Sequence, residues 1–499
     1  MASSNPSHSP INNTAKFSCD FRGPAEAFPH FWEQVVGSDH APIALRADWQ
    51  AQLRRCHGEL GFRSVRFHGL LSDDMGTLIE HDGALLYSFH NIDKVFDFVL
   101  GIGMRPFVEL GFMPRALASG DKTVFRYAAN VTPPKDYAQW AELIRRLIAH
   151  WIARYGLAEV QNWHFEVWNE PNLEAFWSGT QAEYFKLYKC TVAAIKGVHA
   201  GLKVGGPATA KNAWIQDFVE FCADQQIACD FISTHHYPTD ALGKESDDTE
   251  TALAESTRSL LREQTRKAKE DAGAKPLFYT EWNSSSNPRD ALHDEPYAAA
   301  FVVKTILEAK GLVEGYSFWT FTDIFAENYF PSVPFHGGFG LLNLHGIAKP
   351  IYRAFELLHR LGDEQLTVEG RHATVDVWVV RGTGKLTVLV SNYERPRHPL
   401  RSEHLQIALA NAPRPDTVSI ERIDDEHANA KALWLTMGSP EYPDATQLER
   451  LQKASALHRQ PLVSRYEECT LFLEVELPPQ GVAAITVEFD TSTDGRPTP

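Results

Sequence analysis

The 499-residue sequence lacks several features that would place it in a large class of proteins. No run of about 18 consecutive apolar residues is present, so we expect no membrane-spanning helix. The first residues, MASSNPSHSPINNTAK, are polar and contain no apolar segment of a signal peptide. Lysine and arginine form no cluster, and the formal net charge is −16, which disfavours a nucleic-acid partner and a polyanionic substrate. We therefore expect a cytoplasmic protein that binds neither membranes nor nucleic acid.

Cysteine is scarce, and two diagnostic motifs are missing. The six cysteines form no CxxC pair and lie mostly in apolar or helical stretches, so we expect reduced thiols. No GxGxxG follows the first strand candidate, which weighs against a doubly wound nucleotide-binding sheet. The stretch STHHYPTD (233–240) suggests a metal-dependent hydrolase as an alternative, but no HxH motif stands on the first strand candidate. We expect neither a metal ion nor a cofactor.

Apolar residues are plentiful, at 43% of the chain with twelve tryptophans, which is enough for a large core. From about residue 25 to about 355, short apolar runs alternate with amphipathic helical patterns. The strand candidates are 31–37, 64–69, 105–112, 163–170, 202–208, 230–237, 276–283 and 315–323. The clearest helical candidates are 136–156, 182–200 and 297–311. This alternation predicts an α/β fold, a (β/α)8 TIM barrel, with functional residues at the C-terminal strand ends. A doubly wound open sheet is the alternative.

The pattern changes after about residue 360. Runs such as ATVDVWVVRG and ECTLFLEVELPPQG alternate apolar and polar residues between glycine and proline turns, which predicts an antiparallel β-sandwich. We expect a flexible segment at 1–14, a catalytic barrel at 15–360 and a β-sandwich accessory domain at 361–490, followed by a tail at 491–499. A helical insertion is expected near 426–457, and the first barrel residues are candidates to pair with the sandwich.

Two glutamates, Glu170 and Glu281, end the fourth and seventh strand candidates. These strands lie on opposite sides of an eight-stranded ring, so the two carboxyl groups can face each other across its mouth. Glycosidases use such a pair, one carboxyl to protonate the leaving oxygen and one to attack the anomeric carbon or activate water. Each alone has a structural explanation: Glu170 could cap a helix starting at Pro171, and Glu281 could form an ion pair. Pro171 also favours an extended preceding residue, which would help to fix Glu170.

The surrounding motifs make the comparison specific. WNEP on the fourth strand and TEW on the seventh resemble the retaining barrel glycosidases. Together with VRFHGLLSDDMG, GFMPRALASG, FEVWNEPNLEAFW and FHGGFGLLN, which span residues 65–343, they resemble glycoside hydrolase family 39. This is the family of β-xylosidases and α-L-iduronidases. The β-rich C-terminal region fits the accessory sandwich of that family.

The resemblance implies roles for the two glutamates and for the end of the sixth strand. Glu170 would be the general acid/base, and Glu281 the nucleophile that forms a covalent glycosyl-enzyme, so that configuration is retained. His235 and Tyr237 match an H-x-Y motif, in which the tyrosine would orient the nucleophile by hydrogen bonding. Glu170 would need a raised pKa that falls once the nucleophile is esterified.

Further sugar contacts follow from the same resemblance. Asn169 would bind the 2-hydroxyl next to the nucleophile, and His68 would contact hydroxyls of the terminal ring. Trp319 would form the floor under that ring. Glu327 would bind distal hydroxyls and set the length of the pocket.

The expected function is that of an exo-acting β-D-xylosidase that releases xylose from xylo-oligosaccharides. α-L-Iduronidase, α-L-arabinosidase and β-glucosidase activities are alternatives within the family, and a non-catalytic carbohydrate-binding barrel is an alternative of another class. Iduronate carries a carboxylate that calls for lysine or arginine, and the predicted strand ends offer neither, which favours a neutral pentose. The sequence is compatible with a monomer or with pairing through the second domain.

Overall fold

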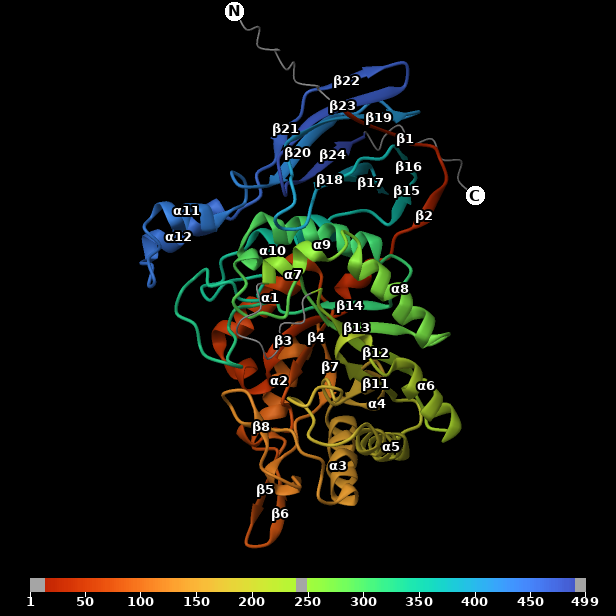
Figure 1. Cartoon of the computed structure of the whole chain (residues 1–499), viewed down its shortest axis with the longest axis vertical. Helices are drawn as coiled ribbons and strands as arrows, with labels where there is room; N and C mark the ends of the chain where they lie inside the picture. The colour runs from red at the N-terminus through yellow and green to blue at the C-terminus, as the bar shows by residue number, and fades with distance from the viewer. Residues whose placement is uncertain (1–13, 239–248, 490–499) are drawn as a thin grey trace, which may run out of the picture.

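Eight parallel strands close into a barrel in the computed structural model, which describes residues 14–238 and 249–489 (Figure 1). Their order around the ring follows the sequence, so the predicted (β/α)8 barrel is confirmed. The strands are β3 (Val36–His40), β4 (Ser64–His68), β7 (Arg105–Leu110), β10 (His164–Val167), β11 (Lys203–Thr209), β12 (Phe231–His236), β13 (Leu277–Trp282) and β14 (Gly315–Phe318). The predicted tail 491–499, and all but the last residue of the predicted segment 1–14, lie outside the described residues.

The predicted first strand, 31–37, is wrong in its position. Phe31–Glu33 form a 3-10 helix, η1, and β3 begins only at Val36. The side chains of η1 are buried, and Trp32 stacks on His30 at 4.6 Å between ring centroids. The apolar run therefore reflects a buried turn that leads into the strand.

Helices cover the outside of the barrel. They are α1 (Ala47–Leu60), α2 (His90–Gly101), α3 (Tyr137–Tyr155), α4 (Leu157–Val160), α5 (Gln181–Val198), α6 (Ile215–Asp224), α7 (Thr249–Glu255), α8 (Leu260–Ala272), α9 (Pro296–Glu308) and α10 (Pro350–His359). The longest, α3, begins where the Asp136 side chain accepts from Ala138 N–H and ends at Gly156. Trp140, Leu147 and other apolar residues every three to four positions bury one face of α3 against the barrel.

The C-terminal region forms two stacked sheets with a core separate from that of the barrel. One sheet has the order β16-β1-β19-β23-β22 and the other β2-β15-β17-β18-β24-β20-β21. These strands are β1 (Ala15–Asp20), β2 (Ala25–Ala27), β15 (Glu364–Leu366), β16 (Val368–Glu369), β17 (Val375–Gly382), β18 (Lys385–Asn392), β19 (Glu403–Ala410), β20 (Thr417–Ile423), β21 (Gln460–Pro461), β22 (Ser464–Glu467), β23 (Thr470–Leu477) and β24 (Val482–Glu488). Among the described residues every pair in these sheets is antiparallel except β1 with β19. The predicted sandwich is thus confirmed, and β1 and β2 join it from the other end of the chain.

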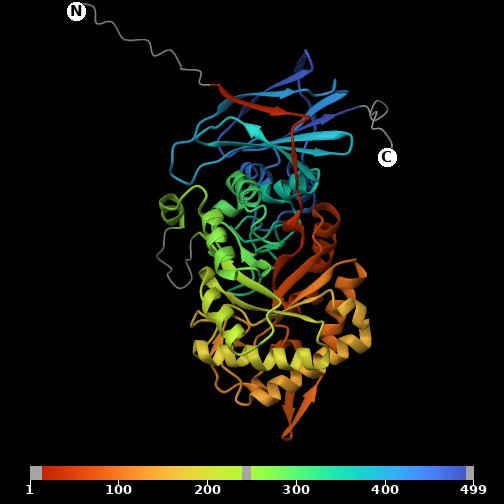
Figure 2. The same cartoon turned by 90° about the vertical axis from the view of Figure 1, so that its right-hand side faces the viewer.

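Two helices, α11 (Ala430–Thr436) and α12 (Ala445–Ala454), leave the sandwich between β20 and β21. Both views place the sandwich beside α9 and α10, on the outside of the barrel, and the hairpin of β5 (Leu78–His81) and β6 (Ala84–Tyr87) at the opposite end of the molecule (Figures 1 and 2). Trp434 and Leu451 of these helices pack on Phe335 and Ile347 of the loop after β14. The insertion therefore supports a barrel loop, although it belongs in sequence to the sandwich.

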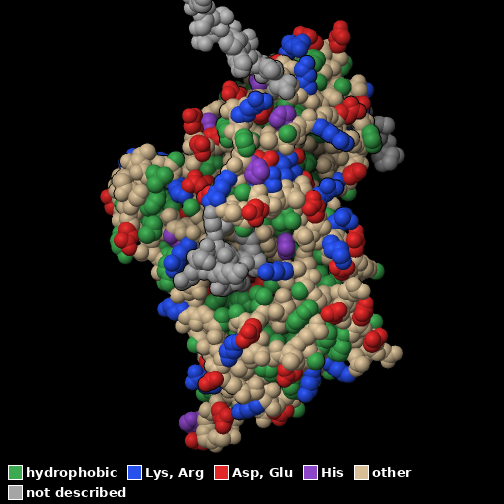
Figure 3. Space-filling view, viewed as in Figure 1, with side chains coloured by type: hydrophobic (Ala, Val, Ile, Leu, Met, Phe, Trp, Pro, Cys, Tyr) green, Lys and Arg blue, Asp and Glu red, His purple; other side chains and the backbone are tan. Residues whose placement is uncertain are grey.

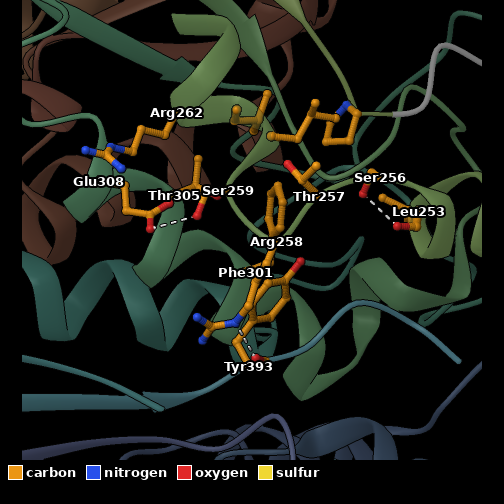
Figure 4. A pocket seen from close by; sticks show the side chains of 13 residues that line it. Leu253, Ser256, Thr257, Arg258, Ser259, Arg262, Phe301, Thr305, Glu308 and Tyr393 are labelled. Carbon is orange, nitrogen blue, oxygen red and sulfur yellow. Dashed lines mark hydrogen bonds between the residues drawn. The ribbon is translucent and has the colours of Figure 1, made fainter. Parts of the chain in front are cut away.

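Arg258, between α7 and α8, joins the barrel to the sandwich. Its side chain lies beside the ring of Tyr393 (Figure 4) and donates to the backbone oxygens of Tyr393 (2.9 Å) and Thr374 (2.6 Å). It also pairs with Asp376 at 2.5 Å. The pocket beside it holds about 10 Å³, room for about one water molecule. Hydrogen bonds and an ion pair of Arg258 therefore connect the barrel to the sandwich with little free space between them.

The distribution of charged side chains on the surface agrees with the sequence, in which lysine and arginine form no cluster. On the face seen in Figure 3, acidic and basic side chains are interspersed, and neither sign forms a continuous patch. Within residues 14–238 and 249–489, the helices are too short or too polar to cross a membrane.

The side chains inside the barrel are apolar at the N-terminal strand ends and polar toward the C-terminal strand ends. Near the N-terminal strand ends, Val35, Phe107, Phe231 and Phe278 form an apolar cluster, with His164 packed against its rings. Burial lowers the pKa of His164 to about 4, so this histidine is neutral at pH 7. The cluster closes one end of the barrel, and polar side chains occupy the interior beyond it.

We predict that Phe278→Ala lowers the free energy of unfolding by about 3–5 kcal/mol, because it opens a cavity in this closed end. Chemical denaturation followed by tryptophan fluorescence would measure the change. Ile79→Ala, on the exposed face of the β5–β6 hairpin, is the matched control and should change stability by less than about 0.5 kcal/mol. Equal effects of the two substitutions would contradict this account of the barrel interior.

Candidate active site

The eight residues predicted to form the site lie together at the C-terminal ends of the barrel strands. They are His68 (β4), Asn169 and Glu170 (after β10), His235 and Tyr237 (in and after β12), Glu281 (β13), and Trp319 and Glu327 (after β14). At most 8% of the surface of any of them is exposed. The structure brings them into one connected cluster, and their roles stay predictions.

The backbone at Glu170 differs from the sequence expectation. Its φ is +44°, in the left-handed region, so the expectation that Pro171 holds it extended is wrong. The next helix, α5, begins only at Gln181 with Thr180 as its cap, so the helix-cap explanation of Glu170 is wrong as well. The N–H of Glu170 donates to Ala208 O at 2.8 Å and ties this turn to β11. A left-handed residue other than glycine is strained, and such strain is typical of functional positions.

A chain of hydrogen bonds assigns a proton to Glu170. The Thr280 hydroxyl donates to Glu166 Oε1 at 2.7 Å, so its lone pairs face His235 Nε2 at 3.1 Å, which must carry a hydrogen. Burial lowers the pKa of His235 well below its usual range, so the ring carries only that one hydrogen at neutral pH. Nδ1 of His235 is then an acceptor, 2.9 Å from Glu170 Oε1. The hydrogen between these two atoms therefore comes from Glu170.

The electrostatics of Glu170 agree with this assignment. Burial, followed by the nearby carboxylate of Glu281, raises the pKa of Glu170 well above its usual range. One oxygen of each glutamate and a ring nitrogen of His235 lie within 4.8 Å of one another. These three atoms are also potential metal ligands. The arrangement sets a protonated carboxyl directly beside a second carboxylate.

Glu281 accepts hydrogen bonds on both of its oxygens. The Tyr237 hydroxyl donates to Oε2 at 2.8 Å, and Arg66 Nη1 donates to Oε1 at 2.8 Å. Nε2 of His68 lies 3.5 Å from Oε1. Charge-assisted bonds of this kind are typical of an ionised carboxylate in a fixed orientation. The ion pair considered as a structural explanation thus exists, and it holds Glu281 in the site.

Arg66 is the most important residue that the sequence reasoning missed. Its guanidinium is fully buried and donates to Glu166 Oε2 (2.6 Å), Asn169 Oδ1 (2.9 Å) and Glu281, with Glu109 Oε2 3.0 Å away. Burial acts to lower the pKa of Arg66, but the three carboxylates outweigh it and raise that pKa. A detectable signal was present, since Arg66, Glu109 and Glu166 each interrupt an apolar strand, in VRF, VEL and FEV.

Aromatic rings and Glu327 form the other side of the site. Trp319 lies 4.7 Å from the ring of His68, and a side chain at Gly37 would come within 2.6 Å of the Trp319 ring, so only glycine leaves room there. Glu327 Oε1 is 3.7 Å from His68 Nε2. Burial, with Asp39 close by, raises the pKa of Glu327 well above its usual range. The cluster therefore has a flat aromatic wall and a second carboxyl whose pKa is raised.

Comparison with known proteins gives a consistent assignment. The model of the glycosyl hydrolases of family 39 matches residues 16–464. A β-xylosidase from Caldicellulosiruptor saccharolyticus is 49% identical over 466 residues, covering 92% of this chain and 95% of the relative. A β-xylosidase from Geobacillus stearothermophilus is 36% identical over 482 residues, covering 93% and 94%. The crystal structure of a β-xylosidase from Caulobacter crescentus CB15 superposes with a TM-score of 0.83 at 32% identity, covering 96% of this chain and all of that one.

We predict that Glu170→Gln stabilises the protein at neutral pH. A carboxyl whose pKa is raised by folding stabilises the fold below about 4.5, its usual pKa, and this stability is lost as pH rises through the raised value. The variant should therefore exceed the wild type in unfolding free energy at pH 7, with a gap that grows by up to about 1.4 kcal/mol per pH unit in that window.

Denaturant unfolding at pH 4.5, 6 and 8 would measure this gap. Glu403→Gln removes a buried glutamate of the sandwich and is the control for a general effect of pH. A gap that is the same at all three pH values would contradict a raised pKa at Glu170.

Proposed function

The chain belongs to the glycosyl hydrolases of family 39, and we propose that it is a retaining, exo-acting β-D-xylosidase that releases xylose from xylo-oligosaccharides. The observation that carries the proposal is the close approach of Glu170 and Glu281, whose facing oxygens lie within 4.8 Å. Retaining glycosidases hold their carboxyl groups about 5–5.5 Å apart, whereas inverting ones need roughly 6.5–9.5 Å to admit a water molecule. The short separation supports direct attack by Glu281.

In the first step, Glu170 gives its proton to the glycosidic oxygen while Glu281 Oε1 or Oε2 attacks the anomeric carbon. The bond to the leaving oxygen breaks, its electron pair goes to that oxygen, and a glycosyl ester of Glu281 forms. Tyr237 and Arg66 hold the attacking carboxylate, and release of one of these hydrogen bonds frees an oxygen for attack. Because Glu281 becomes neutral in the ester, the negative charge that helps to raise the pKa of Glu170 disappears.

In the second step, Glu170 accepts a proton from a water molecule that attacks the anomeric carbon and breaks the ester. His235 favours this step, because its Nδ1 lone pair faces the ionised Glu170 without a hydrogen between them. Recovering a proton restores that hydrogen bond, so His235 acts as a positioning residue that promotes the return of Glu170 to its acid form. Two displacements at one carbon retain the configuration.

The electrostatics of the site support a neutral sugar. Arg66 lies in the site although the strand ends offered no arginine, but its N–H groups already face Glu166, Glu109, Glu281 and Asn169. A uronic acid would bring a further carboxylate to a site that already contains an excess of carboxyl groups. Xylose carries no charge, and the two relatives named above are β-xylosidases.

The two loops that meet beside Glu327 support exo action. The backbone N–H of Arg126, in the turn between β8 (Thr123–Val124) and β9 (Ala129–Asn130), donates to Glu327 O at 2.6 Å. Tyr127 of the same turn stacks on His40 at 3.7 Å between ring centroids. This turn and the loop after β14 thus meet beside Glu327 and close one side of the barrel mouth. A closed side favours the terminal residue of a chain.

We predict opposite azide products from the two carboxyl variants acting on an aryl β-D-xyloside. Glu170→Ala should keep fast glycosylation with an activated leaving group but turn over about 10²–10⁴-fold more slowly, because deglycosylation lacks its base. Azide should restore turnover and give the β-azide. Glu281→Ala should be almost inactive, and azide should give the α-azide. Glu403→Ala, at a buried glutamate of the sandwich, is the control and should keep wild-type activity.

Full activity of Glu170→Ala or Glu281→Ala would refute the assignment of the two carboxylates. Wild-type protein that binds xylobiose without cleaving it would favour the non-catalytic carbohydrate-binding alternative.

We also predict selectivity against charged sugars. The wild type should hydrolyse an aryl β-D-xyloside at least about 100-fold faster, by kcat/KM, than an aryl α-L-iduronide, since a buried carboxylate without a partner costs several kcal/mol. Comparable kcat/KM values for the two substrates would overturn the choice of a neutral pentose within the family.

A further inference from the structure

Two histidines converge on one carboxylate oxygen at the N-terminal end of the barrel, away from the site described above. His30 Nδ1 lies 2.7 Å from Glu33 Oε1, and His359 Nδ1 lies 2.8 Å from the same oxygen. His30 precedes the short helix η1, Glu33 is its last residue, and His359 ends α10. Residues far apart in sequence thus direct three potential ligand atoms toward one point, all within 4.8 Å of one another.

The other nitrogen of His30 determines which of its atoms can bind a cation. Nε2 lies 3.2 Å from the backbone oxygen of Gly362, which can only accept a hydrogen bond. With its hydrogen on Nδ1, neutral His30 donates to Glu33 Oε1; with its hydrogen on Nε2, it donates to the Gly362 carbonyl and turns its Nδ1 lone pair toward Glu33 Oε1. In the second tautomer two acceptors face each other, and a metal ion between them would bind to both. Metal-bound histidines characteristically donate their remaining N–H to a backbone carbonyl in this way.

The arginine next to this cluster approaches the other oxygen of Glu33, not Oε1. Arg63 approaches the other oxygen of Glu33, Oε2, at 3.5 Å and is 59% exposed, so its charge is screened by water. Gly61 packs its backbone against the ligands: a side chain there would come within 2.4 Å of His359 Nδ1 and 3.0 Å of Glu33 Cδ. His359 is 36% exposed, which gives an ion a path from solvent.

We propose that His30, Glu33 and His359 bind a Zn²⁺ ion with a water molecule as the fourth ligand. Two imidazoles and a carboxylate form a donor set that suits this borderline-soft ion. Ligands 2.0 Å from a tetrahedral zinc are about 3.3 Å apart, so the site opens by about 0.5 Å on binding. The half-exposed His359 side chain can supply this movement.

The position gives the ion a structural role. The chain enters the barrel through His30 and leaves it through His359, and the two segments run side by side into the sandwich, where β2 pairs with β15. Phe28 N–H donates to Asp363 O at 2.7 Å between them. Zn²⁺ would link both crossings from barrel to sandwich and stabilise the folded state, since ligands that bind only the folded form raise its stability.

Isothermal titration of the full chain with Zn²⁺ at pH 7.5 tests the proposal. We expect a saturable site with one ion per chain, weakened by at least about tenfold in His30→Gln and in His359→Gln. His404→Gln, at an exposed histidine of the sandwich near Glu474, is the matched control and should bind as the wild type does. Zn²⁺ should raise the thermal unfolding midpoint of the wild type and of the control, but not of the two site variants.

Binding at the barrel mouth gives a different result. Zn²⁺ held by Glu170, His235 and Glu281 would be lost in Glu281→Gln and kept in His359→Gln, and it would inhibit hydrolysis of the aryl β-D-xyloside. The proposal fails if the wild type shows no saturable site, or if the site survives in His359→Gln. His30→Gln and His359→Gln lie outside the catalytic cluster, so folded variants should keep wild-type activity.

Discussion

The buried guanidinium of Arg66 is the interaction on which the site depends. It holds carboxylates from three other strands, β7, β10 and β13, together with the amide that follows β10. Removing one partner of such a buried network leaves uncompensated charge, which is why the set is expected to act as a unit. Arg66 therefore holds together the strand that precedes the proposed acid and the strand that carries the proposed nucleophile.

The protonation of the cluster follows from its depth in the barrel. Three carboxyl groups, those of Glu109, Glu166 and Glu281, contact this one guanidinium, and that of Glu170 lies beside Glu281, so the four cannot all be ionised at low cost. Burial raises the pKa of Glu166 as well as that of Glu170. The hydrogen bonds through Thr280 and His235 determine which of these carboxyl groups keeps its proton. They leave Glu170 as the hydrogen-bond donor at the end of the series. The fold thereby gives carboxyl groups of one chemical type different surroundings, as the proposed acid and nucleophile require.

The candidate functional residues at strand ends could be predicted from the sequence, but charged residues inside the strands could not. Glu170 and Glu281 could be identified because the barrel geometry brings the ends of separate strands to one face. Arg66 could not be placed, since a charged residue within an apolar run has no partner in its own neighbourhood. Apolar content alone misplaced the first strand, because the buried turn at Phe31 and Trp32 has the same composition as a strand. Local preference also failed at Glu170, where packing against β11 overrides the influence of Pro171.

The pairing of β1 with β19 has a consequence for how the chain is made. Ala15 pairs with Leu405, so β1 leaves the ribosome about 390 residues before its partner strand exists. At about 5–20 residues per second, that interval is on the order of a minute. During this time Phe17 and Cys19, buried in the finished sandwich, have no sheet to join. The barrel can form first, and the sandwich closes last around a strand that was synthesised before it.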